Sequence, residues 1–96
     1  MNKIEQWCKN NELILQENKE AFFINERAIL TPDYNINNKF FIEIIDDLSY
    51  LNENQIEYRK YFSKSYGPLL CLTKGSLDTI AQITKKDIEN YYHISL

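Results

Sequence analysis

The stretch Asn37–Leu51, NNKFFIEIIDDLSYL, is the densest apolar segment of the chain and decides how the rest is organised. Its large apolar residues recur at i, i+3, i+4, i+7 and i+10, which is the spacing of one face of an α-helix. The stripe consists of Phe41, Ile44, Ile45, Leu48 and Leu51. We therefore predict a central helix over residues 37–51, buried along this face and rimmed by carboxylates on the other.

The segments on either side of this helix are typical of strands. Residues 12–16 alternate apolar and polar side chains, and residues 21–25 are short, apolar and aromatic, so a first hairpin is expected here. Residues 69–73, LLCLT, form a continuous apolar run between two glycine-containing turns, which indicates a buried strand. Residues 33–38 are expected to form a connecting loop.

Residues 55–64 fit two interpretations. As a strand, the segment would alternate its side chains and pair with 69–73 in a second hairpin. As a helix, it would place Tyr58, Tyr61 and Phe62 on one face. The strand is preferred because tyrosine, isoleucine and phenylalanine are enriched in sheets.

Both ends of the chain carry helical signals. Ile4, Trp7 and Cys8 share a face and predict a helix over residues 3–9. Near the other end, Ser76 and Thr84 can cap two short helices, the second with an acidic residue three positions later. The class predicted is α+β: a single compact domain over residues 1–96, with a mainly antiparallel sheet of about four strands packed on the central helix. An all-helical bundle is the competing architecture.

The chain lacks the residue patterns of common catalytic and cofactor sites. It has two glycines, one histidine and two cysteines in 96 residues, too few for a glycine-rich phosphate loop or a regular zinc site. No catalytic, cofactor-binding or metal-binding residues are predicted, and an enzyme is disfavoured. Without a signal peptide or a long apolar run, we expect a cytoplasmic protein that does not enter the membrane.

The net charge of −3 conceals an uneven distribution. Residues 58–96 carry six bases and three acids, and residues 58–66 interleave bases with tyrosines, as nucleic-acid-binding segments do. This gives one alternative, a small nucleic-acid-binding regulator that also uses the C-terminal helices. The overall negative charge disfavours it, because phosphate neutralisation dominates such binding. Its basic residues would be Arg59, Lys60, Lys64, Lys85 and Lys86.

Residues 1–57 carry eleven acids and five bases, and several of the acids cluster around the end of the predicted central helix. Such a surface suits a basic protein partner, because complementary charge speeds association. Small acidic inhibitors of basic toxins share this size, charge and lack of catalytic residues. The leading hypothesis is therefore an inhibitor of the toxin-neutralising or immunity type, with tyrosines as anchors. The predicted contact residues are Glu43, Asp46, Asp47, Tyr50, Glu53, Glu57 and Tyr58.

Overall fold

The computed structural model describes residues 2–96 and has the predicted α+β class. A sheet of four strands runs in the order β1-β4-β5-β6, and a separate hairpin pairs β2 with β3. Two pairings of the larger sheet are antiparallel, and β5 and β6 run parallel. The strands are β1 (Leu15–Glu17), β2 (Phe22–Asn25), β3 (Ala28–Leu30), β4 (Tyr34–Ile36), β5 (Phe40–Ile45) and β6 (Leu69–Thr73).

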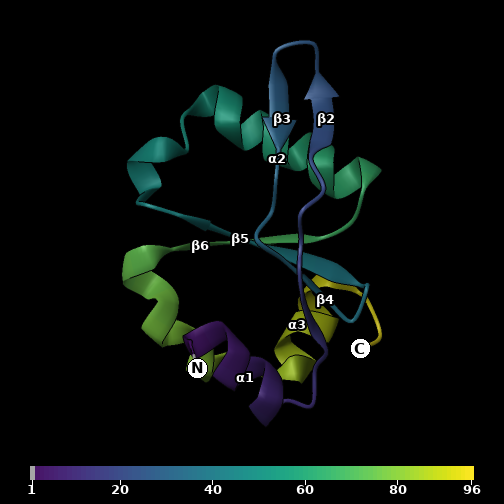
Figure 1. The fold of residues 1–96 in the computed structure, drawn as a ribbon, viewed down its shortest axis with the longest axis vertical. Coiled ribbons are helices and arrows are strands. Elements are labelled where there is room, and N and C mark those ends of the chain that lie inside the picture. The colour runs from purple at the N-terminus through teal and green to yellow at the C-terminus, as the bar shows by residue number, and fades with distance from the viewer. Residues whose placement is uncertain (1) are drawn as a thin grey trace.

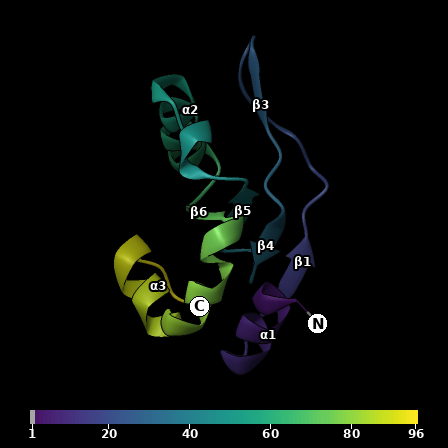
Figure 2. The same cartoon turned by 90° about the vertical axis from the view of Figure 1, so that its left-hand side faces the viewer.

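Helices cover both faces of this sheet (Figures 1 and 2). On one face lie α2 and the β2–β3 hairpin, and on the other lie α1 and α3. None of the helices within residues 2–96 is both long and apolar enough to cross a membrane. The helical elements are α1 (Lys3–Asn10), η1 (Leu48–Tyr50), α2 (Glu53–Ser65), η2 (Lys74–Gln82) and α3 (Lys85–Tyr92), where η marks a 3-10 helix.

The prediction of a central helix over residues 37–51 is wrong, because this stretch contains strand β5 followed by the short η1. β5 lies between β4 and β6 and is covered on both faces, with Phe40 and Ile42 fully buried on one side. A strand covered on both faces is apolar at nearly every position, so its sequence cannot be told from a buried helix by periodicity. Its β-branched and aromatic residues favour the strand.

The preferred strand over residues 55–64 is also wrong, because the segment lies within α2. The Asn52 side chain caps this helix by accepting a hydrogen bond from the Gln55 backbone N–H at 3.0 Å. Of the helical face predicted as the alternative, Phe62 is fully buried and Tyr58 packs beside it, whereas Tyr61 is about half exposed. The helix connects the parallel strands β5 and β6, a connection that a tight hairpin cannot make.

Neither predicted hairpin forms. In the second, residues 55–64 are helical, and β6 pairs with β5 instead. β1 pairs with β4, a strand inside the predicted loop over 33–38, and β2 pairs with β3 instead of β1. The strand over 69–73, the N-terminal helix and the helical C-terminus are confirmed. The Thr84 capping box is present as predicted, but η2 begins earlier than expected and is capped by Thr73, with Ser76 as the reciprocal partner.

Each face of the sheet has its own apolar core. The larger core, beneath α1, η2 and α3, contains Trp7, whose indole N–H donates to the Ile83 carbonyl at 2.6 Å. The smaller core, beneath α2, is centred on Phe62 and includes Ile24 and Leu30 from the hairpin. Between α2 and β5 this second face also carries charged residues, and these lead to the candidate site.

Candidate functional site

A buried ion pair joins β5 to α2. The Arg59 guanidinium donates from Nε and Nη2 to the two carboxylate oxygens of Glu43, at 2.7 and 2.9 Å. A third nitrogen, Nη1, donates to the backbone and side-chain oxygens of Gln55. Both charged residues are less than a tenth exposed. Such two-point geometry fixes the orientation of both side chains and of the elements that carry them.

The surroundings of the pair keep Arg59 charged. Burial alone would lower the pKa of Arg59, and the hydrogen bonds and negative charge of Glu43 outweigh burial, so the pKa is raised above its ordinary value. The guanidinium carbon also lies 5.3 Å from the centre of the Tyr50 ring, within the range of a cation–π contact. Glu43 is therefore engaged inside the protein and is not a free surface carboxylate.

In front of this pair lies an open hollow of about 770 Å³, here called the acidic hollow. It is located where the parallel strands β5 and β6 end, and four carboxylates and one lysine line it. Binding sites in sheets with parallel strands commonly lie at the carboxyl ends of those strands. The lining residues are Asp33, Glu43, Ile44, Ile45, Asp46, Asp47, Ser49, Tyr50 and Lys74.

Three aspartates of the hollow are held in different ways. Asp33 accepts a hydrogen bond from the Ile44 backbone N–H at 2.7 Å. Asp46 forms an exposed ion pair with Lys74 at 2.7 Å. Hydrogen bonds from the side chain and backbone of Ser49 lower the pKa of Asp47, so its carboxylate stays charged to lower pH than an ordinary aspartate.

The structure groups some of the predicted contact residues and separates others. Asp46, Asp47 and Tyr50 share the rim of the acidic hollow, with Glu43 buried in its wall. Glu53 is exposed at the first residue of α2.

Glu57 and Tyr58, like Glu53, do not line this hollow. Glu57 lies on α2 and forms an exposed ion pair with Lys60 at 3.4 Å. Tyr58 is half-buried against the Phe62 core, so it helps to hold α2 in place. The alternative nucleic-acid surface also has one basic residue fewer to offer, because Arg59, one of its five bases, forms a buried ion pair with Glu43.

One lining residue of the hollow, Asp33, was not predicted from the sequence, and neither was the exposure of Leu48. Asp33 follows Pro32 in a segment interpreted as a loop, and the pairing of β4 with β5 brings it beside Ile44. Leu48 was assigned to the buried stripe, yet it is 72% exposed on η1, between Asp47 and Ser49, which both line the hollow. A leucine and a half-exposed tyrosine beside carboxylates form a surface with both apolar and acidic character.

Comparison with protein-family models, curated proteins and solved structures finds no match to this chain. The function is therefore inferred from the residues and their arrangement alone. Within residues 2–96, no group of three or more His, Cys, Asp or Glu side chains is placed to hold a metal ion.

Cys71 lies behind Arg59, and its thiol is 3.6 Å from a carboxylate oxygen of Glu43. Burial, with the charge of Glu43, raises the pKa of Cys71 from 9.0 to about 11. At pH 8 we expect iodoacetamide to alkylate Cys71 about a hundredfold more slowly in the folded protein than in urea, because the thiolate is the reactive form. The rate should rise with pH until about pH 11, as peptide-mapping mass spectrometry can follow. A rate that already levels off near pH 8 would contradict this.

Proposed function

We propose that this protein binds another, basic protein and acts as an inhibitor of the toxin-neutralising or immunity type. The observation that carries the proposal is the acidic hollow, with Tyr50 in its lining and the exposed Leu48 between the lining residues Asp47 and Ser49. The carboxylates of Asp33, Asp46 and Asp47 would attract basic side chains, and the two apolar residues would supply contact area. Interfaces commonly combine such apolar anchors with a charged surround.

The proposed mode of action is to occupy a surface of the partner, and it needs no catalysis. Its rigidity comes from the interior, where the Arg59–Glu43 pair fixes β5 against α2. Tyr50 contacts this pair on one side and faces the hollow, so the binding surface is supported by a buried contact. A surface that is already ordered loses less conformational entropy on binding than a mobile one.

The test is a comparison of two charge-reversed variants. Asp46→Lys with Asp47→Lys changes the net charge by +4, and so does Glu20→Lys with Glu26→Lys, which alters exposed acids near the β2–β3 hairpin. Proteins from the native cell that co-purify with the wild type at low salt should include a basic protein. The hollow variant should associate with it at least about tenfold more slowly, and the control should differ little.

Two further measurements make this result specific. Asp47→Asn keeps an oxygen that can cap η1, and it separates loss of charge from loss of the cap. The difference between wild type and hollow variant should shrink at high salt, where exposed charges are screened. Equal association rates for the hollow variant and the wild type would refute the proposal.

A further inference from the structure

A second feature, separate from the acidic hollow, is the outer edge of β6, the last strand of the four-stranded sheet. In a parallel ladder, alternate residues of a strand turn both backbone groups toward the neighbouring strand. Phe41 N–H donates to the Pro68 carbonyl at 2.8 Å, so residues 70 and 72 bond to β5. Residues 69, 71 and 73 turn their backbone groups away from the sheet.

Backbone groups at both ends of this edge are hydrogen-bonded to side chains of the protein and, among the described residues, those in the middle are not. The Tyr92 hydroxyl donates to the Leu69 carbonyl at 3.1 Å. At the other end, Thr73 N–H donates to the Ser76 hydroxyl, which in turn donates to the Thr73 carbonyl. The N–H and C=O of Cys71 lie between these two ends, and within residues 2–96 no hydrogen-bond partner is found for either group. They can therefore pair with one residue of an added strand.

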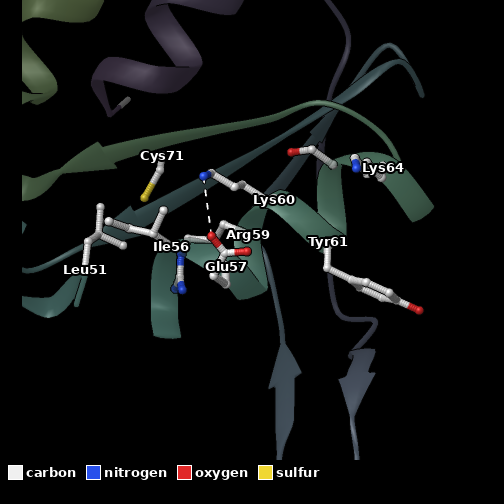
Figure 3. A pocket seen from close by; sticks show the side chains of 9 residues that line it. Leu51, Ile56, Glu57, Arg59, Lys60, Tyr61, Lys64 and Cys71 are labelled. Atoms are coloured by element: carbon white, nitrogen blue, oxygen red, sulfur yellow. Dashed lines mark hydrogen bonds and ion pairs between the residues drawn. The ribbon is translucent and has the colours of Figure 1, made fainter. Parts of the chain in front are cut away.

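Two hollows flank this open position, one on each face of the sheet. On the α2 face, a hollow of about 630 Å³ is lined by Leu51, Ile56 and Cys71 among others. Cys71 and Ile56 both line it, and in the view of Figure 3 the Tyr61 side chain is directed away from these two. On the α3 face, a hollow of about 310 Å³ is lined by Leu70, Ile83, Asp87, Ile88, Tyr91 and Tyr92. In Figure 2, α2 and α3 lie on opposite sides of the sheet at its β6 end.

This arrangement matches the geometry of an added strand. In an antiparallel added strand, the residue directly opposite Cys71 would exchange two backbone hydrogen bonds with it and direct its side chain to the α2 face. Its two neighbours would direct their side chains to the α3 face, because successive side chains of a strand alternate. One apolar side chain would then enter the larger hollow, and its neighbours would reach the smaller one.

The charge of the larger hollow indicates which strand fits. Lys60 and Lys64 are exposed on its α2 wall, and Arg59 adds a third cation that Glu43 already neutralises. Glu57 pairs with Lys60, while Lys64 has no ion-pair partner in the part of the chain described. Acidic residues two positions before and after the central one would lie on this same face, near these lysines.

We propose that the edge of β6 is a docking site for an extended segment of a partner protein, with three apolar residues flanked by acidic ones. A second copy of this chain does not fit, because a two-fold axis at Cys71 would bring Lys60 and Lys64 of each copy close to the same lysines of the other. The site does not depend on the acidic hollow, and its failure would leave the proposed function untouched.

The probe for this site is the capped peptide Glu-Val-Leu-Val-Glu, added to the uniformly ¹⁵N-labelled protein. Its binding at up to millimolar concentration should shift the backbone amide signals of residues 69–73 and of α2 near Ile56. It should also slow hydrogen exchange at the Cys71 amide, because that group becomes bonded. Two matched peptides serve as controls: Lys-Val-Leu-Val-Lys reverses the charge, and Glu-Val-Pro-Val-Glu lacks the central N–H. Each should bind at least about tenfold more weakly.

Variants of the protein with lysines replaced by glutamates complete the test. Lys60→Glu with Lys64→Glu should reverse the preference between the acidic and the basic peptide. Lys19→Glu with Lys39→Glu, which has the same net charge and alters exposed lysines elsewhere, should leave the preference unchanged. The proposal is overturned if β6 signals do not move, if the two charged peptides bind equally, or if the free protein forms dimers that protect the Cys71 amide.

Discussion

Replacing Arg59 by methionine should cost about 3–5 kcal/mol of the free energy of unfolding at pH 7, measured by urea unfolding. The reason is the partner left behind, because Glu43 is 9% exposed and would keep a buried carboxylate without its two hydrogen bonds from Arg59. A domain of this length has a total stability of about 5–14 kcal/mol, so the loss is a large fraction of it.

A double variant identifies the unpaired buried charge of Glu43 as the cause. Glu43→Leu combined with Arg59→Met should recover most of the loss, since an apolar pair of similar volume is often as stable as a buried ion pair. If the double variant is as unstable as the single one, packing and not charge is responsible.

The class of the fold was predictable from the sequence, while its central element was not. The caps of α3 and the apolar run of β6 are local signals, and both were interpreted correctly. The stretch containing β5 is apolar on both sides because it lies between covering layers, which no local pattern reveals. Residues 55–64 were assigned to a strand for their tyrosine, isoleucine and phenylalanine content, so the β-α-β order of β5, α2 and β6 was predicted as helix-strand-strand.

The candidate site was partly predictable for the same reason. Asp46, Asp47 and Tyr50 are neighbours in the sequence, so their grouping survives the change from helix to strand and η1. Glu43 was assigned to the same rim, and it turns out to be buried because a central strand directs alternate residues to each face. Its partner Arg59 lies 16 residues away on α2, a contact that only the crossover from β5 to β6 creates.

The second large effect is expected for Phe62→Ala, which should lower the free energy of unfolding by about 3–5 kcal/mol. Phe62 is fully buried, and its ring centre lies within 5.3 Å of those of Phe22, Phe41 and Tyr66. Truncation therefore removes the shared contact of α2, the hairpin and β5. Urea unfolding measures the loss.

The position of Phe62 also determines where the protein should loosen first. The β2–β3 hairpin is not part of the four-stranded sheet, and an isolated two-stranded hairpin is only marginally stable. In Phe62→Ala, amide exchange should accelerate first in β2, β3 and α2, while α1 and α3 keep their protection on the larger core of the opposite face. The matched control is Phe23→Ala: Phe23 belongs to the same hairpin but is 68% exposed, so its loss should change stability by no more than about 0.5 kcal/mol. Equal losses of stability for Phe62→Ala and Phe23→Ala would show that Phe62 is not a central contact. A uniform rise of amide exchange over both faces would show that the two cores do not unfold separately.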